Sequence, residues 1–398
     1  MRGTLASLLC LLVALAGCQR SVTPLPQEAY VWQRQWTPAL NATLDAARTT
    51  FAGYRVLAAE SDRSGALTIV HPDFAALTAA RLPTTAVLRI NGSDPAIDAR
   101  GLAAHIRDIA SDWGRAGVNL RGIEIDHDCA SARLPEYATL LMALRRDLPR
   151  DLRLSITALP AWIGSPALPD VLTAVDESVL QVHATRAPDA GLFDAPAARL
   201  WIVAYAQLSS KPFFVSLPAY GVRAAFDDRG RANAVEAETP RALANADSHE
   251  LRADPVEVAA LLREMERAPP VHLAGVLWFR LPSKDDRRSW SFATLRAVIE
   301  GAPLRPQLEV RVDNTADGAG DVVLSNAGAI DAPLVAGIGV HGRGCAHADA
   351  SNGFQLQARP DGWRFAAPAG SVLRAGRESR VGWLRCDIVE KVNLDEAP

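Results

Sequence analysis

Short hydrophobic runs alternate with segments whose hydrophobic residues recur every three or four positions, from residue 30 to residue 303. The runs are typical of buried β-strands, and the three-to-four spacing is typical of amphipathic helices. Helical patterns lie between most of the runs, for example over residues 99–116, where Leu102, Ile106 and Ile109 share one face. Eight runs predict strands, at residues 30–33, 54–58, 85–90, 122–125, 152–157, 178–182, 212–217 and 273–279.

This alternation predicts an α/β fold with parallel strands. Eight repeats within residues 30–303 fit a (β/α)8 TIM barrel, which takes about 250 residues. An open, doubly wound sheet is the alternative. The glycine-rich phosphate loop that usually follows the first strand of such a sheet is absent from this sequence. We therefore predict that residues 30–303 form a TIM barrel, the domain in which a catalytic site is expected.

The pattern changes after residue 304, where alternating hydrophobic and polar residues are separated by glycine and polar turns. Such alternation predicts a small antiparallel β-sandwich over residues 304–398. This domain could bind carbohydrate or cap the barrel. We favour the structural role, because Trp363 and Trp383 are its only evident aromatic candidates for a sugar platform.

The first 18 residues have the composition of a targeting signal, with Arg2 followed by an apolar stretch over residues 4–17. This stretch is too short to span a membrane as a helix. It ends in Leu-Ala-Gly before Cys18, which resembles a bacterial lipobox; an ordinary secretory signal is the alternative. We expect residues 1–18 to be a lipoprotein signal with lipidation at Cys18, and residues 19–29 to be a tether. The protein would then lie in the bacterial cell envelope, at a periplasmic or outer-membrane face, with only the lipid in the membrane.

Export permits disulfide bonds, and we expect one between Cys345 and Cys386, which lie in the same predicted domain. Cys129 is expected to be a small buried apolar residue. The sequence contains no CxxC pair and no HExxH helix, so we predict no metal site and no cofactor. A net charge of −3 and a pI near 6.3 give no indication of nucleic-acid binding.

Active sites of TIM barrels lie at the carboxyl ends of the strands. Polar and aromatic residues at the predicted strand ends are therefore candidates for substrate binding. His183 could serve as a proton carrier or as a hydrogen-bonded barrel residue. The segment over residues 221–254 is long and weakly periodic, and we expect it to close over an extended ligand. The substrate-binding candidates are Trp32, Glu60, Arg89, Asn91, His183, Tyr220, Trp278 and Arg280.

The fourth predicted strand carries three acidic residues, Glu124, Asp126 and Asp128, at alternate positions. Alternation places them on the inner face of the barrel and turns His127 toward the helices. Repulsion between carboxylates about 6.5–7 Å apart should raise the pKa of at least one of them, as a general acid requires. Arg89 or Arg280 could balance the remaining charge. A structural ion network without turnover is the alternative reading of this cluster.

The segment from Ile123 to Asp128 resembles the strand-four signature DxxDxDxE of the chitinase-like family eighteen glycoside hydrolases. The resemblance implies that Asp128 is the proton donor, although it is one methylene shorter than the family's glutamate. Asp126 would orient an acetamido group of the substrate. Trp278 resembles the tryptophan at the floor of the family's sugar site. Arg121 stands where the family has its first acid.

From about residue 28 to the C-terminus, the chain also resembles an uncharacterised family of bacterial lipoproteins, defined only as a domain of unknown function. In that family the acidic strand-four segment followed by cysteine is similar. This resemblance supports the domain layout and implies no activity.

Two functions follow from these observations. The first is a glycoside hydrolase-like enzyme that acts on a cell-envelope or exported polysaccharide or oligosaccharide, with Asp128 as acid and Asp126 or Glu124 assisting. The second is a non-catalytic barrel that binds a glycan or a protein partner. A metal-dependent hydrolase is a distant third, since His127 is expected to face away from the acids.

Overall fold

The computed structural model describes residues 24–62, 65–91, 98–183, 191–227, 229, 232–236, 248–314, 319–334, 337–368 and 370–395. The expected signal, the lipidation at Cys18 and residues 19–23 of the expected tether lie outside these residues. The end of the expected tether is part of the fold, because residues 27–29 belong to the first barrel strand. Within the described part of the chain, no helix is long and apolar enough to cross a membrane.

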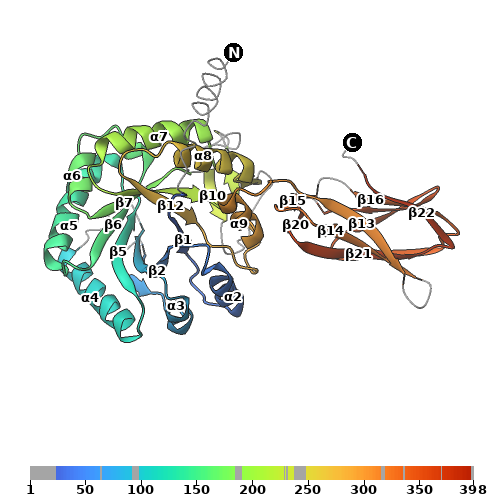
Figure 1. Cartoon of the computed structure of the whole chain (residues 1–398), viewed down its shortest axis with the longest axis horizontal. Helices are drawn as coiled ribbons and strands as arrows, with labels where there is room; N and C mark the ends of the chain where they lie inside the picture. Colours follow the sequence, from blue (N-terminus) through green and yellow to red (C-terminus); the bar gives the residue numbers. More distant parts are fainter. Residues whose placement is uncertain are drawn as a thin grey trace, which may run out of the picture.

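Eight parallel strands form a closed barrel, in the order β1-β12-β8-β7-β6-β5-β4-β2 (Figure 1). The barrel closes because β1 pairs in parallel with both β12 and β2. The predicted TIM barrel is therefore confirmed, and every predicted run coincides with a strand. All eight strands lie within three residues of the predicted bounds, and β1 begins three residues earlier than predicted. The strands are β1 (Gln27–Val31), β2 (Gly53–Ser61), β4 (Thr84–Ile90), β5 (Leu120–His127), β6 (Arg153–Ala158), β7 (Glu177–Gln181), β8 (Phe213–Pro218) and β12 (Leu273–Phe279).

One helix of the outer layer follows each barrel strand. In α4, the side chain of Asp98 caps the N-terminus by accepting from the amides of Arg100 and Gly101. Its apolar face, which includes Leu102 and Ile106, is buried against the strands, as the sequence pattern predicts. The helices are α2 (Pro38–Ala47), α3 (Phe74–Ala80), α4 (Ala99–Arg115), α5 (Leu134–Asp147), α6 (Leu168–Thr173), α7 (Ala195–Leu208), α8 (Pro255–Arg267) and α9 (Phe292–Glu300), with 3-10 turns η1 (Ser131–Arg133) and η2 (Pro160–Trp162).

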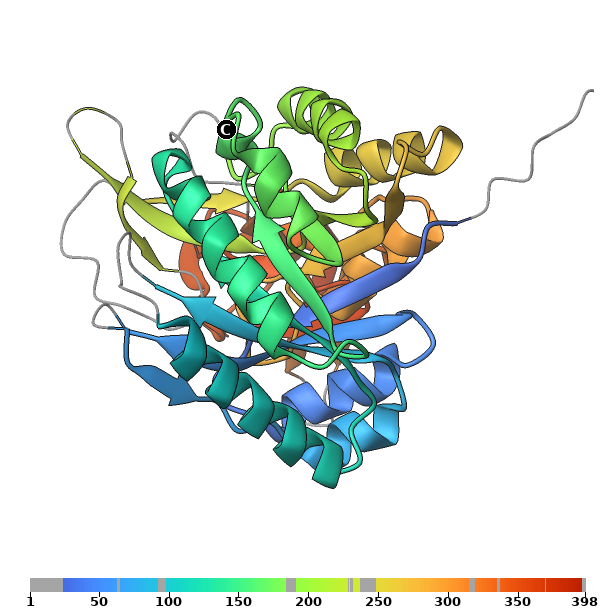
Figure 2. The ribbon, with the colours of Figure 1, turned by 90° about the vertical axis from the view of Figure 1, so that its left-hand side faces the viewer.

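Short additional strands extend the end of the barrel where the active site is expected. β3 (Leu67–Ile69) pairs antiparallel with β2. The segment after β8 forms a three-stranded antiparallel sheet of β9 (Gly221–Phe226), β10 (Ala232–Glu236) and β11 (Ser248–Arg252). The segment expected to close over a ligand thus contains regular β-structure in its described part, and its closure stays a prediction. Figure 2 shows the yellow-green hairpin of β9 and β10 projecting from the end to which the barrel strands point.

The C-terminal strands form two four-stranded antiparallel sheets, β13-β14-β21-β17 and β18-β19-β16-β22, and a short pair, β15-β20. Apolar side chains of both sheets, among them Val322, Val340 and Phe365, form one shared core, which is the arrangement of a β-sandwich. Cys345 and Cys386 are joined by a disulfide. The strands are β13 (Leu308–Asn314), β14 (Gly320–Asn326), β15 (Ala332–Pro333), β16 (Gly337–Arg343), β17 (His347–Ala350), β18 (Gln355–Arg359), β19 (Gly362–Ala366), β20 (Val372–Leu373), β21 (Arg377–Arg385) and β22 (Ile388–Leu394).

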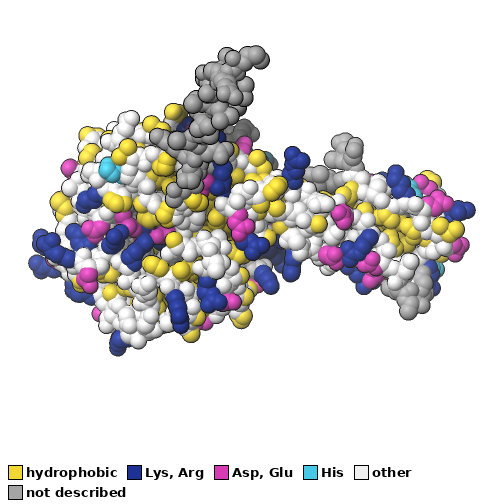
Figure 3. Space-filling model, viewed as in Figure 1, with side chains coloured by type: hydrophobic (Ala, Val, Ile, Leu, Met, Phe, Trp, Pro, Cys, Tyr) yellow, Lys and Arg dark blue, Asp and Glu magenta, His cyan; other side chains and the backbone are white. Residues whose placement is uncertain are grey.

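The sandwich contacts the barrel through the connection between β12 and α9 (Figure 1). Arg374 donates hydrogen bonds to Asp331 and to the backbone carbonyls of Asp286, Arg287 and Ser289. Basic and acidic side chains are interspersed on the face shown in Figure 3, so this face has no large patch of one sign.

Candidate functional site

Arg89 joins two acidic residues at the carboxyl end of the barrel. β4 and β5 pair in a register that places Arg89 beside Asp126. Arg89 Nη1 lies 2.7 Å from Asp126 Oδ2, and Arg89 Nη2 lies 2.7 Å from Asp128 Oδ2. Asp126 is buried, whereas the Asp128 side chain is 41% exposed. The expected pair of strand-end acids is thus held by one guanidinium, with Asp128 facing solvent.

One oxygen of Asp126 is buried without a hydrogen-bond partner among the described residues. Oδ2 binds Arg89, but Oδ1 has no such contact. Burial raises the pKa of Asp126 to about 6, against the lowering effect of Arg89 and with a further rise from Asp128. Asp126 is therefore a carboxyl group that holds a proton at mildly acidic pH and has an oxygen available for a further hydrogen bond.

A pocket of about 500 Å³ lies beside these residues, at the ends of β2 and β4. Glu60 and Asn91, both expected to bind substrate, line it together with Arg34. Asn91 Nδ2 donates to Glu60 Oε1 (2.9 Å), and Arg34 Nε donates to Glu60 Oε2 (2.7 Å). Arg89 Nε donates to Asn91 Oδ1 (3.2 Å), so one polar network runs from the pocket to Asp126 and Asp128.

Arg34 is a member of this network that the sequence analysis missed. It lies two residues after Trp32, beyond the end of β1, and a systematic list of charged residues after every strand would have included it. Its hydrogen bond is the largest cause of the lowered pKa of Glu60.

Glu124 does not reach the mouth of the barrel, which corrects its expected catalytic role. Its side chain is fully buried and forms an ion pair with Arg55. Tyr30 donates to Glu124 Oε1 (2.6 Å), and Ser155 and Thr157 donate to its two oxygens. The carboxylate is saturated by these partners, so Glu124 belongs to a structural ion network inside the barrel.

His183 is also inside the barrel. Its Nδ1 lies 3.2 Å from the hydroxyl of Tyr220, and its Nε2 lies 3.3 Å from that of Ser216. Burial lowers the pKa of His183 to about 3. With this pKa the ring is a weak base at physiological pH, and both of its nitrogens lie beside buried hydroxyl groups, so the geometry favours the hydrogen-bonded barrel residue.

The aromatic candidates are mostly covered. Trp278 is fully buried on the outer face of β12, where its Nε1 donates to Gln27, so it does not floor a sugar site. Trp32 and Tyr220 are each 8% exposed and pack against Phe279, a partly exposed ring absent from the sequence-based candidates. Alternation along β12 turns Phe279 inward and Trp278 outward, and this signal was present in the sequence.

Three further residues near the site are buried. Arg280 is buried against Asp286 (Nη2 to Oδ2, 2.5 Å), so it does not balance the strand-four acids. His127 faces the helices, where its Nδ1 lies 3.2 Å from the carbonyl oxygen of Ile90. The Cys129 thiol is buried and free, and burial raises its pKa to about 11. In the described residues, no group of three His, Cys, Asp or Glu side chains is placed to hold a metal ion.

The profile of one protein family, described as a domain of unknown function (DUF3142), matches residues 80–284, which are 205 of the 398 residues. The chain belongs to the DUF3142 family. The match to DUF3142 includes Arg89, Asp126 and Asp128. A second profile, a domain of unknown function named DUF8456, matches residues 309–387 in the β-sandwich. A comparison with curated proteins gave no match.

Solved structures are similar to this DUF3142 protein in the barrel. The spore cortex-lytic enzyme SleL of Bacillus megaterium QM B1551 has a TM-score of 0.51 and 14% identity, over 70% of this chain and 73% of SleL. A chitinase of Bacteroides thetaiotaomicron has a TM-score of 0.49 and 12% identity, over 70% and 96% of the two chains. A chitinase of Chromobacterium violaceum ATCC 12472 has a TM-score of 0.47 and 14% identity, over 69% and 98%. The likeness to SleL shows a shared barrel fold.

Proposed function

We propose that this protein is a glycoside hydrolase that acts on a cell-envelope or exported polysaccharide. The observation that carries the proposal is the pair Asp126 and Asp128, bridged by Arg89 at the mouth of a TIM barrel. Most glycoside hydrolases use a protonated carboxyl group beside a second carboxylate, and substrate-assisted enzymes replace the second carboxylate as nucleophile by an acetamido group of the substrate. The barrel shared with SleL, whose name describes a spore cortex-lytic enzyme, adds support from fold analogy.

The two acids have different roles in this proposal. Asp128 is exposed and donates a proton to the glycosidic oxygen. Asp126 is buried beside it and offers its free Oδ1 to the substrate, for which an acetamido group is the partner implied by the family resemblance. Arg89 fixes both carboxylates and limits their mutual repulsion.

The pocket lined by Arg34, Glu60 and Asn91 holds a neighbouring sugar ring. Its charged and amide groups are suited to sugar hydroxyls, and the polar network connects it to the two acids. Lipidation at Cys18 would keep the enzyme at the cell envelope, where such polysaccharides lie. This localisation rests on the sequence motif alone.

The test compares wild type with Asp128→Asn on a panel of envelope and exported polysaccharides, with new reducing ends as the readout. Loss of a general acid should lower the rate by about 10²–10⁴-fold and leave binding intact. Asp108→Asn, on the exposed face of α4, is the matched control and should keep full activity. If Asp128→Asn releases reducing ends at the rate of wild type, Asp128 is not the acid.

A non-catalytic glycan-binding barrel is the second candidate, and two observations favour it. Asp128 is ion-paired to Arg89, and the rings expected to stack on sugars are largely covered, as Trp32, Tyr220 and Trp278 show. Retained binding of one glycan without release of reducing ends, in wild type and in Asp128→Asn alike, would support this second function.

A further inference from the structure

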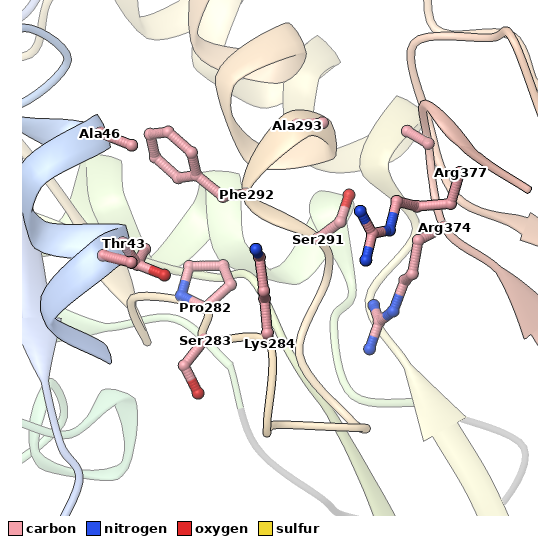
Figure 4. A pocket seen from close by; sticks show the side chains of 12 residues that line it. Thr43, Ala46, Pro282, Ser283, Lys284, Ser291, Phe292, Ala293, Arg374 and Arg377 are labelled. Atoms are coloured by element: carbon pink, nitrogen blue, oxygen red, sulfur yellow. The ribbon is translucent and has the colours of Figure 1, made fainter. Parts of the chain in front are cut away.

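A pocket of about 370 Å³ lies where the barrel and the β-sandwich meet (Figure 4). Its walls come from α2, from the connection between β12 and α9, from the start of α9, and from the sandwich. It shares no lining residue with the pocket at the barrel mouth. Its volume is within the range of about 300–1,000 Å³ that is usual for small-molecule sites, which often lie at domain interfaces.

The walls are mainly apolar, and the charges on them are basic. Ala46, Pro282 and Phe292 form the apolar surface. Lys284 from the barrel and Arg377 from the sandwich point into the same space in Figure 4. Both are exposed residues, and neither has a carboxylate within ion-pair distance in the described part of the chain.

The acidic residues at this interface are engaged elsewhere. Asp331 accepts from Arg374 and from the amide of Ser291. Asp285 accepts from the hydroxyl of Thr37 (2.9 Å). Neither carboxylate forms an ion pair with Lys284 or Arg377 in the described part of the chain, while Arg374 is already paired with Asp331.

We propose that this interdomain pocket binds a small anionic amphiphile. Its acidic group lies between Lys284 and Arg377, and its apolar part packs on Phe292, Pro282 and Ala46. An anion between two cations gains charge-assisted contacts, and the apolar walls add a hydrophobic contribution. Because each domain supplies one cation, the ligand binds only when the two domains are docked. The proposal is independent of the proposed glycosidase activity.

The experiment uses the full chain and the fluorescent anionic amphiphile 1-anilinonaphthalene-8-sulfonate. We expect a saturable increase in fluorescence with one site per chain, displaced by decanoate and much less by the uncharged decanol. Lys284→Glu combined with Arg377→Glu should weaken binding by at least about tenfold, since about 1.4 kcal/mol of lost contact suffices. Ala46→Trp, which fills the pocket from an exposed helix position, should also abolish binding.

The matched control is Arg305→Glu combined with Lys391→Glu, two exposed residues outside the pocket, which changes the net charge equally. This variant should bind the dye as wild type does. Equal binding by the Lys284/Arg377 variant and wild type would overturn the proposal, as would a wild type that binds neither dye nor decanoate. Binding to phosphatidylglycerol vesicles without binding of decanoate would also overturn it, because these cations would then face a lipid surface.

Discussion

The guanidinium of Arg55 and the carboxylate of Glu124 form an ion pair inside the barrel in which neither side chain is exposed. Arg55 also contacts Glu28 and Glu177, at 3.2 Å and 2.7 Å. A single buried cation thus holds three carboxylates, with Arg121 binding Glu28 from the amino end of the barrel. Isolated charges in such a place are costly, so the network is stable only as a whole.

Arg55→Met should destabilise the barrel by about 3–5 kcal/mol, because it leaves buried carboxylates without their partner. The free energy of unfolding in urea measures the effect. The matched control is Arg199→Met, which breaks an exposed ion pair with Glu264 (2.6 Å) and should cost less than about 1 kcal/mol. Equal stability of the two variants would contradict a structural role for the Arg55 network.

Asp126 should make the protein less stable as the pH rises. Its pKa of about 6 in the folded chain is above the value near 3.9 of an unfolded aspartate. Between these pH values the folded state binds more protons than the unfolded state, so stability falls with pH. The free energy of unfolding of wild type should therefore decrease by about 2–3 kcal/mol relative to Asp126→Asn between pH 4 and pH 6.

Urea unfolding of both proteins at several pH values measures this difference. Asp108→Asn, at an exposed position of α4, is the control, and its difference from wild type should stay constant. If wild type becomes more stable relative to Asp126→Asn as the pH rises, the lowering effect of Arg89 on the pKa of Asp126 outweighs the raising effect of burial. Asp126 would then be an ordinary ionised carboxylate.

His183 should stay neutral throughout the physiological pH range, because burial lowers its pKa to about 3. The ring-proton signals of His183 in nuclear magnetic resonance, assigned by their loss in His183→Gln, should not move between pH 5 and pH 8. A titration with a midpoint between pH 6 and pH 7 would restore His183 as a candidate proton carrier.

The fold could be predicted from the sequence because its strands are hydrophobic and its helices amphipathic. The bounds of β12 were predicted without error from one apolar run. β1 begins earlier than predicted because Gln27 and Glu28 are polar and yet buried, and their partners Trp278 and Arg55 are distant in sequence. Local hydrophobicity does not reveal such pairing.

The candidate site could be predicted in part, for a related reason. The alternation of side chains along a strand correctly placed His127 on the opposite face of β5 from the acidic residues. As expected, Asp126 and Asp128 reach the mouth of the barrel. The alternation alone did not distinguish Glu124 from Asp126 and Asp128, because all three point into the barrel. The position of a carboxylate along the barrel axis decides whether it pairs with the buried Arg55 or faces solvent. That position depends on the register between strands, which the sequence of one strand does not contain.

Arg374 holds the sandwich to the barrel, since it donates to three carbonyls of the β12–α9 connection and to Asp331. Asp331 in turn accepts from the amide of Ser291 at the start of α9 (2.7 Å). Arg374→Met removes the donors of all four hydrogen bonds, which should cost about 2–6 kcal/mol at about 0.5–1.5 kcal/mol per hydrogen bond. We expect the sandwich and the barrel to unfold as two separate transitions in calorimetry, and the connection over residues 302–306 to become sensitive to proteases.

Arg377→Met is the control for this variant, because Arg377 is an exposed neighbour on the same domain for which the structure gives no side-chain hydrogen bond. It should unfold as wild type does, although it should lose part of the binding of an anionic amphiphile. If Arg374→Met keeps the wild-type transition and protease resistance while Arg377→Met does not, the docking of the two domains depends on the charge at the pocket and not on the hydrogen bonds of Arg374.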